Sequence, residues 1–290
     1  MVDSSIVAGV DGSQSSLDAV RWAARESSLR MTPLLLLACV TYLGAEDGPR
    51  LAAELRTRAE RDLAEALEAA RASADDGVTD IRAELSHQYA PGALVDCSKG
   101  AEMVVLGRRG LGEFTGGLVG SVTSAVTRHA QCPVAVIDGW SRVDNSTKPV
   151  VVGVDRSPNS ELAIGLAFEE CVLHKAELIA LHAWSDQDLS TLALDAVQED
   201  RSAVETAERS VLADSLAGWG ERFPHVVMRQ TLVRDRPVRH LLELAGEARM
   251  IVLGCRGRGG FAGMTLGSTS AALLHTTPCP LLIARPRSTD

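Results

Sequence analysis

Two tandem α/β domains, each with a five-stranded parallel sheet sandwiched between helices, are the fold that this 290-residue sequence predicts. The first observation is an internal repeat: the GVD motif that ends at Asp11 recurs at Asp155, and the glycine that follows an aliphatic run at Gly107 recurs at Gly254. The second is an alternation of short aliphatic runs with stretches whose apolar residues recur at helical spacing. The third is that the aliphatic runs contain few polar residues, as strands of a parallel sheet covered on both faces do.

The repeat also predicts where the domains begin and end. The motifs keep their order, and their offset changes only from 144 to 147 residues along a copy. The stretch between Trp140 and Pro149 is polar and has the composition of a linker. We therefore predict a first domain at residues 1–140, a linker at residues 141–148 and a second domain at residues 149–290, each long enough to bury its own core.

The individual elements follow in chain order. Aliphatic runs predict the strands of the first copy at Ser5–Val10, Leu34–Val40, Thr79–Leu85, Glu102–Leu106 and Pro133–Ile137. Apolar residues at three- and four-residue spacing predict its helices at Ser15–Arg30, Arg50–Ala74, Pro91–Cys97 and Ser121–Ala130. The second copy predicts strands near Pro149–Val154, Leu178–Ala183, Val226–Val233, Met250–Leu253 and Pro280–Ala284.

Composition and charge exclude several classes of function. The formal net charge of −9 argues against nucleic-acid binding, which needs a basic surface. No run of about 18 apolar residues predicts a membrane span, and the first residues lack the basic and apolar segments of a signal peptide. The six cysteines are scattered, without a CxxC pair or zinc-ligand spacing. We therefore expect a cytoplasmic protein with free thiols, no membrane insertion and no metal site.

Acidic residues follow the first strand of each copy. In an open α/β sheet, ligands bind beyond the carboxyl ends of the strands, which is where Asp11 and Asp155 lie. The alternative is helix capping, because Asp and Ser side chains accept hydrogen bonds from backbone N–H groups at helix starts. We favour ligand contact for the two aspartates and capping for Ser13 and Ser157.

A longer glycine motif follows the fourth strand of each copy. Gly107 and Gly110 are followed by nine residues and then by Gly120-Ser121, and the second copy repeats this spacing from Gly254 to Gly267-Ser268. Glycines allow backbone N–H groups to approach a phosphate, and the helix that starts after the last glycine favours an anion. The alternative is that the glycines only permit tight turns. Neither copy has the GxxxxGK[ST] signature of a Walker-type loop.

These motifs give the chain a resemblance to tandem universal stress proteins, of the ATP-binding, mycobacterial two-domain kind, over essentially its whole length. The resemblance implies the strand order 3-2-1-4-5 and ATP as the ligand, with adenosine near the first aspartate and the second strand, and ribose and triphosphate at the glycine motif. For the first site it implies Gly9, Val10, Asp11, Val40, Gly107, Arg108, Arg109, Gly110, Gly120, Ser121 and Val122. For the second it implies Gly153, Val154, Asp155, Ala183, Asp186, Gly254, Cys255, Arg256, Gly257, Arg258, Gly259, Gly260, Gly267, Ser268, Thr269 and Ser270.

The residues offer little for catalysis. No HExxH or GxSxG motif is present, His182 is predicted to be a satisfied core histidine, and we predict no catalytic residue. The leading hypothesis is an ATP-binding stress-response regulator, with Mg²⁺ carried by the phosphates and nucleotide occupancy as the signal. The mycobacterial resemblance adds growth or dormancy control and an unidentified protein effector. The alternatives are a slow ATPase or nucleotide hydrolase and a ligand-free interaction scaffold.

The implied strand order also predicts how the chain assembles. It places the last strand of each copy at a sheet edge, and bare apolar edges invite pairing. We therefore expect Pro133–Ile137 and Pro280–Ala284 to pair antiparallel with each other. The resemblance to tandem universal stress proteins further implies that two chains form a homodimer.

Overall fold

The computed structural model describes residues 4–41, 48–74, 80–111, 119–139, 147–184, 201–258 and 265–286. The chain divides into two compact units. The first unit comprises Met1–Val143 together with Leu274–Asp290, and the second comprises Asp144–Leu273. The domain limits given above stay predictions, and most of the predicted linker lies outside the described residues.

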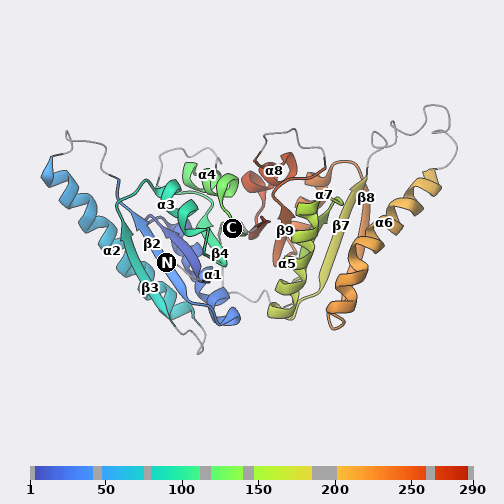
Figure 1. Cartoon of the computed structure of the whole chain (residues 1–290), viewed down its shortest axis with the longest axis horizontal. Coiled ribbons are helices and arrows are strands. Elements are labelled where there is room, and N and C mark those ends of the chain that lie inside the picture. Colours follow the sequence, from blue (N-terminus) through green and yellow to red (C-terminus); the bar gives the residue numbers. More distant parts are fainter. Residues whose placement is uncertain are drawn as a thin grey trace. The chain divides into compact units, whose positions relative to one another are not determined.

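Strands and helices alternate through both units (Figure 1). The first unit contains β1 (Ile6–Val10), α1 (Gln14–Arg30), β2 (Leu34–Cys39), α2 (Pro49–Ser73), β3 (Ile81–Ser86), α3 (Ala90–Cys97), β4 (Met103–Gly107), α4 (Ser121–His129), β5 (Val134–Ile137) and β10 (Leu281–Ala284). The second contains β6 (Val150–Val154), α5 (Pro158–His174), β7 (Leu178–Trp184), α6 (Arg201–Arg222), β8 (Met228–Arg234), α7 (Pro237–Ala245) and β9 (Met250–Gly254), and α8 (Ser268–Thr276) begins in it. The predicted elements are therefore present, with ends displaced by one or two residues in most cases.

The sheet of the first unit confirms the predicted strand order. Its strands lie in the order β3-β2-β1-β4-β5, and each neighbouring pair is parallel. In the second unit β8, β7, β6 and β9 follow the same parallel order. The fold class is thus α/β with two tandem Rossmann-like repeats.

The last strand of the chain belongs to the first unit and makes its sheet mixed. β10 pairs antiparallel with β5, with Leu281 opposite Val136 and Ile283 opposite Val134. The predicted pairing of the two last strands is therefore confirmed. Arg285, which directly follows β10, donates to carbonyl oxygens at the end of α4, including that of Thr127 at 2.6 Å. This contact gives the helix C-terminus a cation and satisfies carbonyls that the helix leaves open.

Aliphatic strands and capped helices explain why these segments fold as they do. Ile6, Leu36 and Met103 are almost fully buried, as expected of strands covered on both faces. In the first unit α1 packs against α2, and α3 against α4, so the two pairs cover the sheet. Ser13 and Ser157 each accept a hydrogen bond from a backbone N–H three residues later, at the starts of α1 and α5. The capping interpretation of these two serines is confirmed.

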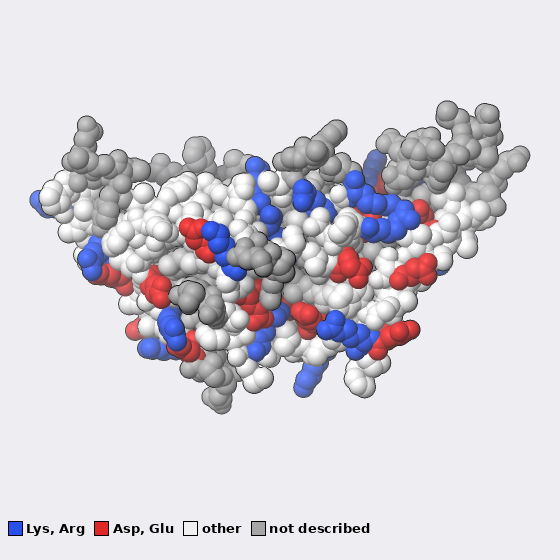
Figure 2. All heavy atoms as spheres, viewed as in Figure 1, with Lys and Arg blue, Asp and Glu red and all other residues white. Residues whose placement is uncertain are grey.

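The surface carries both signs of charge. On the face drawn in Figure 2, acidic and basic side chains are interspersed among apolar and neutral ones. Of the helices in the described part of the chain, none is both long enough and apolar enough to cross a membrane.

Candidate functional site

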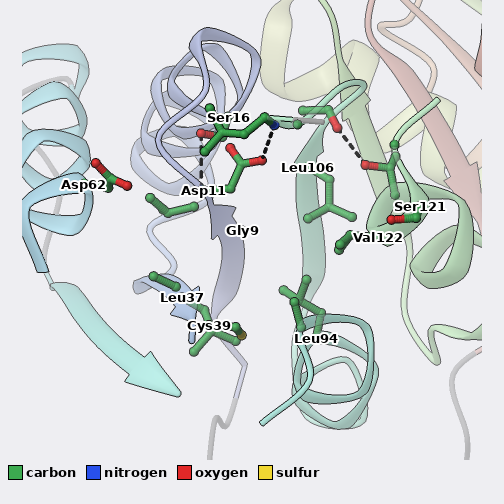
Figure 3. Close-up of a pocket in the computed structure, with 18 of the residues that line it drawn as sticks. Gly9, Asp11, Ser16, Leu37, Cys39, Asp62, Leu94, Leu106, Ser121 and Val122 are labelled. Carbon is green, nitrogen blue, oxygen red and sulfur yellow. Dashed lines mark hydrogen bonds between the residues drawn. The ribbon is translucent and has the colours of Figure 1, made fainter. Parts of the chain in front are cut away.

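A cavity of about 820 Å³ opens at the carboxyl ends of β1, β2 and β4 in the first unit (Figure 3). This edge of the sheet is where parallel α/β folds bind ligands, because the strand order reverses between β1 and β4. α2 contributes Arg58, Ala59 and Asp62 to its wall, and α3 and α4 contribute Leu94 and Val122. The cavity therefore extends across the strand ends, from the helix pair on one side to the pair on the other.

Nearly all residues predicted for the first site meet in this cavity. Ten of them line it, namely Gly9, Val10, Asp11, Val40, Gly107, Arg109, Gly110, Gly120, Ser121 and Val122. Arg108 lies elsewhere: its guanidinium pairs with Asp138 and donates to the carbonyl oxygen of Thr277 at 2.7 Å. Burial lowers the pKa of Arg108 from its ordinary value. The structure thus places Arg108 in a structural contact and leaves Arg109 as the arginine of this motif at the cavity.

Asp11 joins two loops at the edge of the cavity. Its Oδ1 accepts a hydrogen bond from the backbone N–H of Ser13 at 2.9 Å, and its Oδ2 accepts one from Leu111 at 3.3 Å. Asp155 makes the equivalent pair of contacts in the second unit, with Ser157 at 3.0 Å and Arg258 at 3.2 Å. Both carboxylates therefore hold the turn after the first strand against the glycine loop while remaining at the ligand edge.

Four glycines of the motif lie very close to other parts of the protein: Gly107 and Gly254 to backbone atoms, and Gly110 and Gly257 to aspartate side chains. A Cβ at Gly107 would lie 2.6 Å from the backbone of Ser15, and a Cβ at Gly110 would lie 2.4 Å from Oδ2 of Asp11. In the second unit, a Cβ at Gly254 would lie 2.7 Å from the backbone of Asn159, and one at Gly257 would lie 2.2 Å from Oδ2 of Asp155. These positions pack loop against loop, with no left-handed backbone angle involved.

Gly120 differs from those four. Its φ is −59°, and a Cβ there would lie at least 3.5 Å from every atom of the described residues that do not neighbour it in the chain. It starts α4 without a side-chain cap, whereas Ser13 caps α1. In the first turn of α4, the hydroxyl of Thr123 donates to the carbonyl oxygen of Gly107 at 2.8 Å. Among the described residues, the first turn of α4 therefore faces the cavity with no side chain accepting from its N–H groups.

Several cavity residues escaped prediction from the sequence. The wall formed by Leu55, Arg58, Ala59 and Asp62 was missed, although these residues recur at helical spacing along α2. Cys39, at the end of β2, also lines the cavity. Burial, and to a smaller extent the nearby Cys97, raises the pKa of the Cys39 thiol to about 11. The spacing on α2 was a usable signal, but the sequence does not say which strand ends that helix face covers.

The second unit has the same loop framework. Ser270 donates to the carbonyl oxygen of Gly254 at 2.8 Å, as Thr123 does to Gly107. Arg256 and Arg258 are exposed, and Cys255 is buried beside Asn159. Val10 pairs with Ala38 in the first repeat, and the equivalent Val154 pairs with His182 in the second. Two residues further along each strand, Val40 therefore corresponds to Trp184 and not to the predicted Ala183. Gly153 lies in β6, and Gly267, Ser268 and Thr269 lie at the start of α8; Asp186, Gly259 and Gly260 lie outside the described residues.

This arrangement defines a class: a Rossmann-like domain with a cavity at its strand ends and, beside the cavity, a helix N-terminus without a side-chain cap. The model of the universal stress protein family matches residues 4–138 and again residues 146–285, so the chain belongs to that family and carries two copies of its domain. Among relatives, the universal stress protein Rv2623 of Mycobacterium tuberculosis is 38% identical over 288 residues, covering 97% of this chain and 96% of its own. Rv2005c of the same organism is 40% identical over 288 residues, with the same coverage of each chain.

A solved structure confirms the fold at lower sequence similarity. The crystal structure of a universal stress protein from Archaeoglobus fulgidus superposes with a TM-score of 0.74 at 21% identity. The match covers 97% of this chain and 98% of that one. At this level of identity the match shows a shared fold.

Proposed function

We propose that the chain is an ATP-binding regulator of the stress response, with one nucleotide site in each repeat. The nucleotide lies at the strand ends, with its phosphates against the glycine loop and the N-terminus of α4. Occupancy of the sites is the signal, which a protein effector reads in the cytoplasm to control growth or dormancy. The proposal includes a homodimer of the chain, and Mg²⁺ enters with the phosphates.

The observation that carries this proposal is the uncapped start of α4 at the cavity. The first N–H groups of a helix need acceptors, and the positive end of the helix dipole favours an anion. Gly120 supplies no side-chain acceptor, and Ser121 and Val122 both line the cavity. A phosphate group would satisfy these N–H groups, and Arg109 adds a cation at the same edge.

The rest of the cavity suits the other half of a nucleotide. Leu37, Leu94 and Leu106 offer apolar surface for a flat base, and Asp11 and Asp62 offer oxygens that accept from hydroxyl or amino groups (Figure 3). The volume of about 820 Å³ is in the range of pockets that bury small ligands. A ligand with an anionic end and a hydrogen-bond-donating end therefore has one preferred orientation in this site.

The test measures binding by the full chain after nucleotide has been removed. Mass spectrometry identifies any nucleotide released from the purified protein, and calorimetry and thermal melts follow the addition of Mg·ATP. We expect ATP to raise the melting temperature, because a ligand that binds only the folded state stabilises it. Gly120→Val should lose most of this shift. The matched control is Gly246→Ala, where an added Cβ meets nothing within 4 Å.

The remaining outcomes separate the alternative functions. Single-turnover assays with a several-fold excess of protein over ATP would reveal hydrolysis, and product formation would make the chain a nucleotide hydrolase. No shift of the wild-type melting temperature at millimolar ATP would refute nucleotide binding and leave the interaction scaffold. The mass in solution, measured by light scattering, tests the homodimer.

A further inference from the structure

The two repeats differ where the wall helix meets the second strand. Strand register matches Ala38 with His182, because these residues pair with Val10 and Val154. We aligned α2 and α6 on their last residues, Ser73 and Arg222. This alignment matches the buried Leu63 with the buried Leu212. It places Glu208 at the position of Ala59. Ala38 and Ala59 both line the cavity of the first unit. The second repeat therefore has a histidine and a glutamate where the first has two alanines.

His182 and Glu208 contact each other across this position. Nε2 of His182 lies 2.9 Å from Oε2 of Glu208, and Nδ1 lies 2.7 Å from the carbonyl oxygen of Val154. The His182 side chain is fully buried, as predicted for a satisfied core histidine. The pair thus joins the end of β6 to α6 through side chains that occupy the space between them.

At a third position too, the second repeat has the larger side chain. Val40, which lines the cavity of the first unit, corresponds to Trp184 at the end of β7. The Trp184 side chain is 8% exposed, and the guanidinium of Arg234 lies 5.9 Å from its ring centre. Three small or medium side chains at the strand-end wall of the first repeat are thus replaced by three large ones in the second.

We propose that His182, Trp184 and Glu208 make the second repeat the weaker nucleotide site, so that the first repeat fills at lower ATP concentration. This inference rests on the proposed function. Well-packed side chains exclude ligand atoms, because a protein interior yields little space without strain. Arg256 and Arg258 would attract the phosphates of the second site, but both are exposed, and solvent screens their charge. Their attraction therefore offsets only part of the affinity that the second site loses to its three large side chains.

The experiment titrates the full-length, nucleotide-free protein with Mg·ATP and reads two signals. Calorimetry counts the ATP molecules bound per chain. The fluorescence of Trp184 reports binding to the second repeat, and the variant Trp184→Phe shows how much of the tryptophan signal comes from this residue. We expect one ATP molecule per chain to bind tightly, at the first repeat. The fluorescence of Trp184 should change only at an ATP concentration at least about tenfold higher. Equal affinities, or a Trp184 response that accompanies the tight equivalent, would overturn the inference.

Reciprocal variants test the residues themselves. His182→Ala with Glu208→Ala should move the Trp184 response to lower ATP concentration, whereas Ala38→His with Ala59→Glu should weaken the tight equivalent about tenfold or more. Melting temperatures of the nucleotide-free variants identify any that fail to fold. The single change Glu208→Gln, which retains side-chain size, is the control and should leave the order of filling unchanged.

The outcomes also separate this inference from the proposed function. Loss of all ATP binding in the wild-type protein would refute both together. Two equal equivalents in the wild type, unchanged by either pair of substitutions, would refute only the unequal filling. A tight equivalent that the Ala38 and Ala59 changes leave intact would refute the role assigned to these positions.

Discussion

The carboxylate of Asp11 accepts a hydrogen bond from the backbone N–H of Leu111 at 3.3 Å, across 100 residues of sequence. Asp155 repeats the contact with Arg258 at 3.2 Å. In each repeat the aspartate therefore positions the glycine loop, and Asp11 also lines the cavity of the first unit. The other oxygen of each carboxylate accepts from a serine N–H, which is the local contact of the capping alternative, and ligand contact by the two aspartates stays a prediction.

Asp11→Ala is expected to weaken both the loop and the site. Two hydrogen bonds to a charged acceptor are lost, and each contributes about 1.5–3 kcal/mol at most, less where solvent reaches the pair. The free energy of unfolding of the nucleotide-free protein should fall, and ATP affinity of the first repeat should fall with it. Urea unfolding and calorimetry measure the two effects. Asp155→Ala is the matched variant for the second repeat, and unchanged stability in both would contradict the positioning role.

Gly120→Ala and Gly107→Ala should separate ligand space from protein packing. At Gly120 the added Cβ meets protein atoms only at 3.5 Å or more, so the melting temperature without nucleotide should be nearly unchanged while the ATP-induced shift falls. At Gly107 the Cβ would lie 2.6 Å from the backbone of Ser15, so overpacking should destabilise the nucleotide-free protein by about 1–3 kcal/mol. Equal destabilisation by both changes would return Gly120 to a purely structural role.

Arg156→Gly should stabilise the nucleotide-free protein. Arg156 has a φ of 63°, at the position where the first repeat has Gly12 with a φ of 78°. The left-handed conformation costs a side-chain-bearing residue about 1–2 kcal/mol, and the greater freedom of glycine in the unfolded chain offsets part of the gain. A net gain of about 0.5–1 kcal/mol is expected in urea unfolding. The reverse test is Gly12→Ala, which should destabilise, since its Cβ would also lie 2.6 Å from Oδ2 of Asp62.

The sequence predicted the fold and ten of the residues that line the cavity of the first unit, because both depend on local patterns. Continuous aliphatic runs and the 144-residue repeat suffice to predict two repeats with parallel strand order, and strand-end motifs such as Gly9–Asp11 locate the edge where the cavity lies. The α2 wall could not be predicted, because an amphipathic helix does not reveal which strands it covers. Arg108 was assigned to the ligand by its place in the glycine motif of the family that the chain resembles, and only the tertiary contact with Asp138 shows its other partner.

Strand register explains why Trp184, and not the predicted Ala183, corresponds to Val40 of the first repeat. Ala183 was matched with Val40 from a predicted strand that ended at residue 183, whereas β7 continues to Trp184 and pairs in the same register as β2. One residue at a strand end decides whether a small or a large side chain faces the site. Such ends depend on hydrogen bonds between strands, including that from Asp235 to the carbonyl oxygen of Trp184, which no single strand's sequence encodes.

Cys39 offers a chemical probe of the first site. Only the thiolate reacts with iodoacetamide, and burial raises the pKa of Cys39 to about 11. Alkylation should therefore be slow at pH 7 and rise about tenfold per pH unit through pH 9.5 without a plateau, whereas an ordinary thiol levels off once the pH exceeds about 8.5. Peptide mapping by mass spectrometry measures the rate at each cysteine.

Nucleotide should protect Cys39 and leave its neighbour Cys97 reactive. Cys39 lines the 820 Å³ cavity, whereas Cys97 lines a separate cavity of about 650 Å³ beside β3 and α3. Burial raises the pKa of Cys97 as well, so both thiols are less ionised at neutral pH than an ordinary thiol and serve as an internal pair. Millimolar Mg·ATP should slow alkylation of Cys39 several-fold at constant pH, because bound ligand blocks access from the cavity. Equal slowing at both cysteines would indicate a general tightening of the domain, and unchanged labelling of Cys39 in protein that binds ATP by calorimetry would place the nucleotide away from the end of β2.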